Sequence, residues 1–332
     1  MTGLSPEQAA VAARYRTFAA EEVHGVSPSY ECLTLEIAES REVLDFLLGF
    51  PSARRQPNLL LAASRIVAGR VPDLDQLIAL IRDPAARLRT LMLSRTTQTN
   101  EPARTAVLLP VLASLPPPLA LIEVGASGGL CLLPDRYGYD YGTRRIAGAP
   151  GSPTFPCSVQ GPAPLPASVP QIVWRAGLDL SPIDLGSAAD TAWLEVLVWP
   201  EQEHRRRHLR QAIAVARAEP PRVVRGDLLH DLDALIAEAP ADATLVVFHS
   251  AALAYVTPRA TRLRFSAALR GTRAVWISNE APGVFPDIVA QAPTPTPSSR
   301  FLLAVDGVPK AWTGPHGQSL EWFAKGDTRL RR

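Results

Sequence analysis

The stretch that decides the fold is LALIEVGASGGL, Leu119–Leu130. Its first half is apolar and follows three prolines at 116–118, which cannot continue a helix because proline lacks an N–H donor and fixes φ. Its second half carries glycines, which permit positive φ and let a ligand approach the backbone closely. We therefore expect a buried β-strand that runs into a glycine-rich loop, and we expect the loop to bind a nucleotide-like cofactor. A helix beginning just after the loop would point its free N–H groups at that ligand.

Downstream of this stretch, short apolar runs alternate with helical segments. The runs lie at 120–124, 172–174, 223–224, 244–248, 274–278, 301–305 and 319–323, and the helical segments lie at 193–218, 228–239 and 259–269. Such alternation is typical of a mostly parallel sheet covered on both faces. The sequence thus predicts an α/β fold, a Rossmann-like doubly wound sheet of about seven strands over residues 116–332. Residues 148–170 are rich in proline and glycine, which predicts a long loop.

The first part of the chain has a helical pattern. Apolar residues recur at helical spacing over residues 5–18, 30–50, 57–68, 73–83 and 84–93. Ser5-Pro6-Glu7 supplies an N-cap, a first-turn proline and an acid at the positive end of a helix. Residues 1–115 are therefore expected to form an all-helical N-terminal domain that caps the sheet domain.

Composition and charge exclude several classes of protein. The chain has 332 residues, 47% of them hydrophobic, and a net charge of +2, so neither wholesale disorder nor a nucleic-acid partner is expected. The cysteines, Cys32, Cys131 and Cys157, are widely spaced and predict neither a metal site nor a disulfide framework. No run reaches the ~18 apolar residues that span a bilayer, and the amphipathic N-terminus lacks the apolar core of a signal peptide. We expect a cytoplasmic protein without a membrane partner.

Acidic residues stand at the ends of the first three predicted strands, where open α/β sheets bind ligands. Glu123 ends the first strand, Asp179 follows the second and Asp227 follows the third. An acid after the second strand can accept the hydroxyl protons of a ribose, and an acid after the third can accept from an exocyclic adenine amine. Either aspartate also suits the N-cap of a following helix, and both interpretations stay open.

The fourth predicted strand ends in His249-Ser250, and the segment that follows bears Tyr255. Asn279-Glu280 follow the fifth strand in the same way. A histidine at this edge can act as a general base, so we take His249 and Tyr255 as the catalytic candidates. A single histidine at a strand end is also commonly a hydrogen-bonded structural group, and that alternative stays open.

Together these motifs resemble those of class I S-adenosylmethionine-dependent methyltransferases over residues 119–280. EVGASGG (123–129) resembles the family's E/D-x-G-x-G-x-G loop, with Ser127 in place of the middle glycine, while GLDLSP (177–182), VRGDLL (224–229) and VVFHSAALAYV (246–256) resemble the segments that close its second, third and fourth strands. The resemblance implies that the methionine moiety of S-adenosylmethionine is surrounded by Glu123, Gly125, Ser127 and Gly129. It places Asp179 at the ribose and Asp227 at the adenine.

Two features depart from the methyltransferase pattern. Asp179 follows Gly129 by 50 residues, against roughly 20 in a compact βαβ unit. The fourth strand lacks an Asn-Pro-Pro-Tyr-type signature. Nearly the full length is also similar to an uncharacterised bacterial family, common in actinobacteria and defined only as a domain of unknown function. The segments that carry this similarity are QPNLLLA (56–62), QTNEPAR (98–104), GASGGLCLLPDRYGYDYG (125–142), GLDLSPIDL (177–185) and WLEVLVWPEQEHRRRHL (193–209).

Two polar clusters lie outside the cofactor motifs. Residues 98–101 with Arg104 precede the sheet domain, where a helical cap could close over a pocket. A capping box on Thr97 or Thr99 explains the same residues. Residues 135–141, DRYGYDY, suit either a substrate-facing loop or an ordinary surface turn.

Three functions agree with these patterns. The first is S-adenosylmethionine-dependent methyl transfer to a small molecule, with catalysis mostly by proximity and His249 as a general base. In the second, the same fold binds an adenine-containing ligand for other chemistry. In the third, the protein is a non-catalytic interaction scaffold, since a fold does not fix a function.

Overall fold

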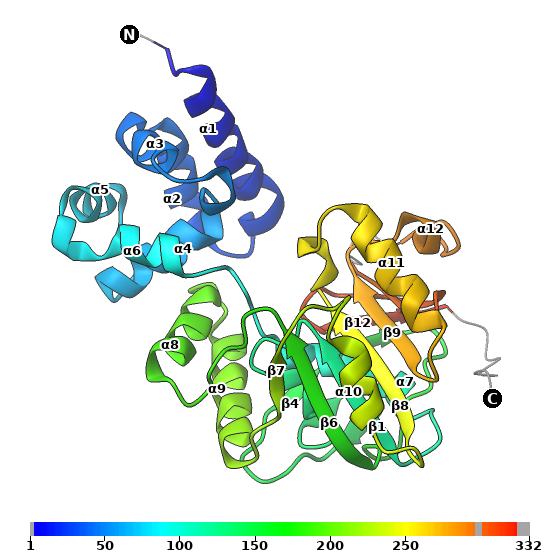
Figure 1. Ribbon diagram of the computed structural model, residues 1–332. Helices are drawn as coiled ribbons and strands as arrows, with labels where there is room; N and C mark the ends of the chain where they lie inside the picture. Colours follow the sequence, from blue (N-terminus) through cyan, green and yellow to red (C-terminus); the bar gives the residue numbers. More distant parts are fainter. Residues whose placement is uncertain (1–2, 296–300, 324–332) are drawn as a thin grey trace. The chain divides into compact units, whose positions relative to one another are not determined.

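The computed structural model describes residues 3–295 and 301–323 (Figure 1). Packing divides the chain into two units. The first comprises residues 1–99 and 188–207, and the second comprises residues 100–187 and 208–332. Residues 188–207 therefore pack with the N-terminal helices, although the predicted division at residue 115 gave them to the other domain.

The first unit is helical and shows no strand in its described residues. Its helices are α1 (Pro6–Phe18), α2 (Pro28–Glu39), α3 (Arg41–Leu48), α4 (Pro57–Ala68), α5 (Leu74–Arg82), α6 (Leu88–Ser94), α8 (Ala188–Leu197) and the start of α9 (Glu203–Ala218), with a π-helical turn at Ala19–Val23. One apolar core joins them and includes Tyr15, Leu44, Leu60 and Trp193. The single helix expected over 30–50 is two helices, because Ser40 is extended and its side chain accepts from Val43 N–H to cap α3.

The second unit contains a nine-stranded sheet of order β5-β12-β11-β10-β9-β8-β1-β6-β7. The strands are β1 (Leu119–Val124), β5 (Ser158–Gln160), β6 (Ile172–Asp179), β7 (Val223–Arg225), β8 (Thr244–Ser250), β9 (Val275–Glu280), β10 (Phe301–Val305), β11 (Val308–Thr313) and β12 (Ser319–Trp322). The five strands from β7 to β9 run parallel, and β10, β11 and β12 continue antiparallel. A mixed α/β fold with a mostly parallel sheet is thus confirmed, but the expected number of about seven strands is two short. The two strands of this sheet that were not predicted are β5, inside the expected long loop, and β11.

Side-chain alternation divides the polar residues of the sheet between its two faces. Helices α10 (Leu232–Glu238) and α11 (Arg259–Arg270) lie in front of the sheet in Figure 1, and α7 (Thr105–Leu112) lies behind it. Ala120, Ile122 and Val124 of β1 pack in one cluster with α10, α11 and α12 (Pro286–Val289). Alternate residues of a strand point to opposite faces, so Glu123 points to the other side. We call these the α11 face and the α7 face.

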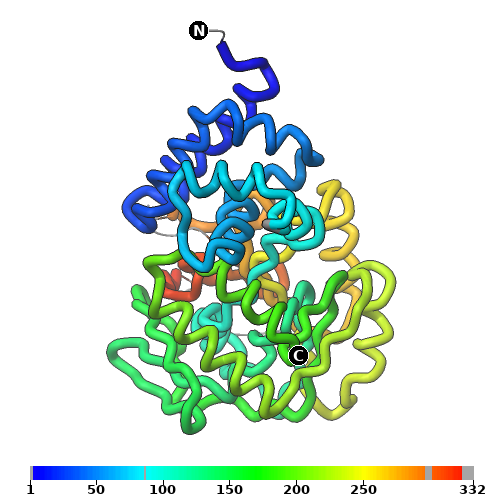
Figure 2. The backbone as a smooth tube through the Cα atoms, turned by 90° about the vertical axis from the view of Figure 1, so that its left-hand side faces the viewer, coloured from blue at the N-terminus to red at the C-terminus, as the bar shows by residue number. Residues whose placement is uncertain are grey.

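The connection from β1 to β6 contains no α-helix, and Figure 2 follows its backbone in teal and green. It contains a three-residue 3-10 turn, Leu130–Leu132, and a small sheet of β2 (Gly138–Asp140), β3 (Arg145–Ile146) and β4 (Thr154–Pro156). Three tyrosines of the 135–141 cluster are buried, and their hydroxyls donate to main-chain carbonyls: Tyr137, Tyr139 and Tyr141. This cluster therefore packs inside the unit, unlike either alternative drawn from the sequence.

Among the described residues, no helix has the length and apolar character needed to cross a bilayer.

Candidate functional site at the carboxyl edge of the sheet

Polar residues line the α7 face where the parallel strands end. Glu123 is opposite Gly177 on β6 and Phe248 on β8. Paired residues share a face, so Gly177 and Phe248 belong to the α7 face. Asp179 lies two residues after Gly177, and Ser250 two residues after Phe248, so both also belong to the α7 face. Ser250 is paired with Asn279, which donates to the Ser250 hydroxyl at 2.9 Å. Four neighbouring strands thus each end in a buried polar side chain on the same face.

The glycine-rich loop after β1 adopts left-handed backbone conformations. Gly125, Ser127 and Gly129 have φ of 75°, 55° and 76°. A serine in this region of φ costs roughly 1–2 kcal/mol, and Ser127 is held there because its N–H donates to Asp179 Oδ2 at 2.7 Å. The other Asp179 oxygen accepts from Ser181 N–H at 2.7 Å. Asp179 therefore connects the glycine loop to the loop that follows β6.

The segment after β8 packs directly on this loop. A Cβ on Gly125 would lie 2.5 Å from the Cβ of Ala252, so only glycine fits there. The helix expected after the loop is replaced by the 3-10 turn at Leu130–Leu132, and the Leu130 N–H donates to the Asn100 side chain at 2.9 Å. The expectation of an N-terminal helix dipole facing the ligand is therefore wrong here, since no helix of sufficient length follows β1.

Glu123 is the electrostatic exception in the site. Its side chain is 3% exposed, and within the described ranges its Oε2 has no hydrogen-bond partner. Burial raises the pKa of this carboxyl well above its usual range, and the neighbouring Asp179 carboxylate raises it further. The Arg104 guanidinium acts in the opposite direction but more weakly. The Ser127 hydroxyl is likewise buried without a partner in the part of the chain that is described.

Residues 100–104 run across the edge of the sheet and touch two of its loops. Arg104 donates from Nε to the Pro315 carbonyl at 2.9 Å and from Nη1 to the Ser250 carbonyl at 3.3 Å. Glu101 caps the short 3-10 turn Pro102–Arg104 by accepting from Ala103 N–H. The N-cap is thus Glu101 itself and neither Thr97 nor Thr99. The Glu101 carbonyl also accepts from the Cys131 thiol at 3.3 Å.

His249 belongs to the α11 face, opposite Glu123. Its side chain is 0% exposed. Trp276 Nε1, which can only donate, lies 2.9 Å from His249 Nε2, so Nε2 accepts and the ring proton is on Nδ1, which donates to Glu280 Oε1 at 2.8 Å. Both ring nitrogens are therefore engaged within the core. This geometry gives His249 a structural role, and its catalytic role stays a prediction.

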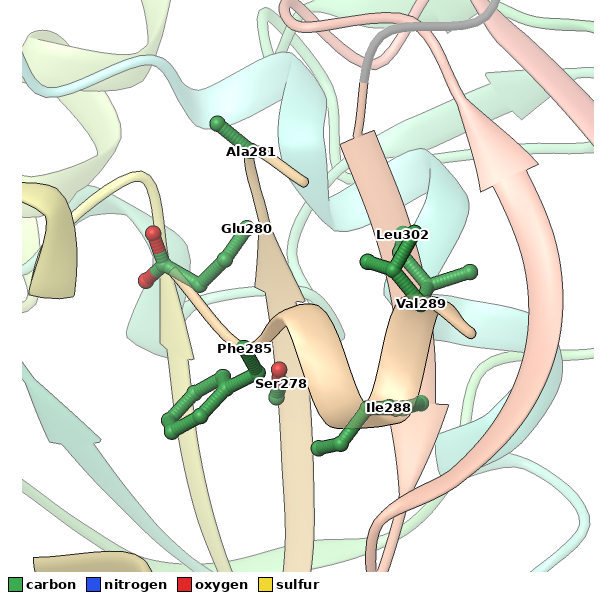
Figure 3. Close-up of a pocket in the computed structure, with 8 residues that line it drawn as sticks. Ser278, Glu280, Ala281, Phe285, Ile288, Val289 and Leu302 are labelled. Atoms are coloured by element: carbon green, nitrogen blue, oxygen red, sulfur yellow. The ribbon is translucent and has the colours of Figure 1, made fainter. Parts of the chain in front are cut away.

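Glu280 also holds the main chain that follows β8. Its Oε1 accepts from the N–H groups of Ala252 and Leu253 at 3.0 and 3.1 Å. Figure 3 shows the Glu280 carboxylate pointing away from Leu302 and Val289. The cavity drawn there has a volume of about 10 Å³, enough for roughly one water molecule. It is therefore too small for a cofactor.

The remaining predicted residues, Tyr255 and Asp227, are not part of the buried polar row, although Gly226, next to Asp227, donates its N–H to the Asp179 carbonyl at 3.0 Å. Tyr255 is 71% exposed on the 3-10 turn Leu253–Tyr255. Asp227 follows β7, accepts from Leu229 N–H at 2.7 Å and donates its own N–H to Asp231. Asp227 thus forms a local turn and is not the N-cap of the following helix, because α10 begins at Leu232 with Asp231 as its N-cap residue. Within the described ranges, no cluster of three or more His, Cys, Asp or Glu side chains is arranged to hold a metal ion.

A family model matches residues 12–322 and thus reaches into both units. The chain belongs to the DUF2332 family, described as uncharacterized proteins conserved in bacteria. No curated protein and no solved structure matches the chain.

The match of the DUF2332 family includes two site residues that the sequence patterns did not single out, His316 and Thr313. Thr313 ends β11 and donates to the Asn279 side chain at 2.7 Å, which extends the polar row to a further strand. His316 follows in the turn between β11 and β12. The available signal was Gly314-Pro315-His316-Gly317, a turn sequence between two apolar runs.

Proposed function

We propose that the carboxyl edge of the sheet binds S-adenosylmethionine and that the protein transfers its methyl group to a small molecule. Support comes first from the strand order. From β1 the chain passes to β6 and β7 on one side, and then to β8 and β9 on the other. In a Rossmann-like, doubly wound sheet this reversal is the switch point where ligands bind. The glycine loop and the segment after β8 meet at that point.

The observation that carries the proposal is the position of Asp179. Its carboxylate ends the strand next to β1 and accepts from the backbone of the glycine loop itself. Its two oxygens accept from the Ser127 and Ser181 N–H groups, which fixes the carboxylate between the glycine loop and the loop after β6. An acid in this position is where the hydroxyls of a ribose bind in Rossmann-like folds. Asp227, at the end of β7, would face the adenine in the same arrangement.

The residues of the glycine loop fit the other end of such a cofactor. Glu123 Oε2 and Ser127 Oγ belong to the buried polar atoms that lack a partner among the described residues. A ligand with an ammonium group and hydroxyls would supply hydrogen bonds to them, which offsets the cost of leaving buried polar atoms unpaired. S-adenosylmethionine supplies an activated sulfonium methyl group, so the protein has mainly to bind and orient the reactants.

Calorimetry with S-adenosylmethionine, S-adenosylhomocysteine, NAD and ATP tests the proposal. We expect the first two to bind, and Asp179→Asn to weaken binding about 10- to 100-fold, because charge-assisted hydrogen bonds contribute roughly 1.5–3 kcal/mol. Asp306→Asn is the matched control: Asp306 also accepts a backbone N–H, from Trp276, but at the opposite edge of the sheet. Binding of NAD or ATP alone would support another adenine-dependent chemistry. Binding of none of the four would support the scaffold alternative.

A further inference from the structure

A second histidine–glutamate pair, His316 with Glu101, lies at the same edge of the sheet as the proposed cofactor site. His316 Nδ1 is 3.9 Å from Glu101 Oε2. The histidine side chain is 35% exposed, whereas the glutamate side chain is 7% exposed. A half-exposed imidazole directed by a buried carboxylate is the arrangement of a general base with its orienting group. In ligand-free structures such contacts are often longer than hydrogen bonds and shorten when substrate binds.

The turn that carries His316 is held in a fixed position. Gly317 has φ of 79°, and a Cβ at this residue would lie 2.0 Å from the Ala103 carbonyl oxygen. Arg104 donates to the Pro315 carbonyl on the other side of His316. The His316 N–H donates to the Gln318 side chain at 2.9 Å. Backbone contacts on both sides therefore fix the position of the His316 main chain, from which the imidazole extends. A catalytic group requires such a fixed position.

The same short segment links His316 to the glycine loop. Glu101 faces His316 with its side chain and accepts from Cys131, just after the glycine loop, with its carbonyl. Arg104 lies close enough to Glu123 to offset part of the rise that burial and Asp179 cause in the pKa of that carboxyl, and it donates to the Ser250 carbonyl. His316, Glu123 and Ser250 are therefore gathered around residues 101–104 on the α7 face.

Resting on the proposed function, we propose that His316 is the general base for the methyl acceptor and that Glu101 is its positioning residue. The acceptor is then a small molecule with a hydroxyl, thiol or amine. As the acceptor heteroatom forms its bond to the methyl carbon, the sulfur–methyl bond breaks and its electron pair stays on sulfur, leaving a neutral thioether. The proton of the acceptor moves to His316 Nε2, on the ring edge away from Glu101. The imidazolium that forms is stabilised by the Glu101 carboxylate.

An electrophilic adenosine analogue tests this assignment without knowledge of the acceptor. We would incubate the full chain with 5′-chloroacetamido-5′-deoxyadenosine and map adducts by mass spectrometry. A nucleophile beside the cofactor's reacting end displaces chloride and forms a carbon–nitrogen bond. We expect alkylation of His316 at least tenfold faster than of the exposed His24, protection by S-adenosylhomocysteine, and no adduct in His316→Gln. Cys131 should stay unmodified, because burial raises the pKa of its thiol well above the usual range.

Glu101→Gln separates positioning from folding. This variant should bind S-adenosylhomocysteine with unchanged affinity, but the adenosine analogue should alkylate its His316 at least threefold more slowly. A purely structural role of Glu101 would not lower the alkylation rate while leaving the affinity unchanged. Binding of S-adenosylhomocysteine without an adduct on His316, or with the adduct on Cys131, would overturn the assignment and leave the proposed function standing. Failure of S-adenosylhomocysteine to bind the same sample would overturn the proposed function, and the assignment with it.

Discussion

Each face of the sheet carries a histidine–glutamate pair, and the two pairs differ in burial and in the distance between their side chains. On the α11 face, His249 and Glu280 are 0% and 2% exposed and 2.8 Å apart, and each makes further hydrogen bonds to the core or main chain. At the α7 face, His316 is half-buried, and its nitrogen is 3.9 Å from Glu101. The first pair is tied to the core and the main chain by hydrogen bonds of both ring nitrogens and of Glu280 Oε1. The second pair is held in place by its surroundings, and its histidine reaches the protein surface, where a ligand can contact it.

The same contrast extends to the other acids of this edge. Each glutamate has an Oε2 without a partner in the described structure. Glu280 Oε1, however, accepts three N–H donors, whereas Glu123 has the Asp179 carboxylate close by, which raises its pKa. Buried polar groups in proteins are nearly always hydrogen-bonded, and exceptions gather at functional sites. The difference between the faces therefore agrees with a structural role of the α11 face and with our proposal of a ligand site on the α7 face.

The largest expected effect comes from removing the glutamate of each pair. Glu280→Ala leaves three buried donors without an acceptor, so we expect it to lower the free energy of unfolding by about 3–5 kcal/mol. Glu101→Ala removes a cap from a 3-10 turn, and we expect a loss of about 1 kcal/mol. Urea unfolding followed by circular dichroism measures both. Equal losses in the two variants would contradict the contrast between the faces.

The register between neighbouring strands decides whether Glu123 and His249 lie on the same face of the sheet. The sequence patterns do not predict this register. The acid at the end of β1 and the histidine at the end of β8 were both identified from the sequence. They point to opposite faces because Glu123 is paired with Phe248 and not with His249. A shift of one residue would exchange the faces. Register is set by the packing of whole strands, so local motifs could place His249 at the right edge but not on the right side.

In the C-terminal strands, a signal for β11 was present in the sequence but was not used in the prediction. Asp306-Gly307 joins β10 to β11, with both residues at positive φ, of 50° and 77°. Asp-Gly between apolar runs is a strong hairpin signal, so β11 could have been predicted from the sequence. Glu101 and His316, by contrast, are more than 200 residues apart in sequence. Tertiary contacts bring them together, those of Gly317 with Ala103 and of Arg104 with Pro315, and no local pattern encodes these contacts.

A second prediction tests whether that contact positions His316. Gly317→Ala should destabilise the protein by about 2–4 kcal/mol, from positive φ and overpacking against a carbonyl, and should slow alkylation of His316 by the adenosine analogue. Gly161→Ala is its matched control, because Gly161 has φ of 77° and a Cβ there would lie 2.0 Å from the Trp322 carbonyl oxygen. We expect a similar loss in urea unfolding from Gly161→Ala but an unchanged alkylation rate. Parallel slowing in both variants would show that general destabilisation, and not position, governs the rate.

The smallest effect, and the only one that depends on pH, concerns Glu123. Below its usual pKa of 4.5 the carboxyl is protonated in both the folded and the unfolded chain. As the pH rises above 4.5, the unfolded chain releases the proton while the folded chain keeps it, because its pKa is raised. The folded state binds more protons there, so the wild type loses stability with rising pH, by at most about 1.4 kcal/mol per pH unit. Glutamine does not titrate and is spared this loss.

The stability of Glu123→Gln relative to wild type should therefore be constant below pH 4.5 and increase between pH 5 and pH 7 in urea unfolding. Glu219→Gln provides the opposite sign at lower pH. Because Arg136 lowers the pKa of Glu219, this variant should lose stability relative to wild type as the pH rises towards 4.5 and should not change between pH 5 and pH 7, and exposure of the pair keeps the effect small. A flat difference for Glu123→Gln would mean that Glu123 ionises as readily in the folded protein as in the unfolded chain. Burial on the α7 face would then not disfavour the ionised form of Glu123, and the electrostatic argument for a ligand beside this residue would fail.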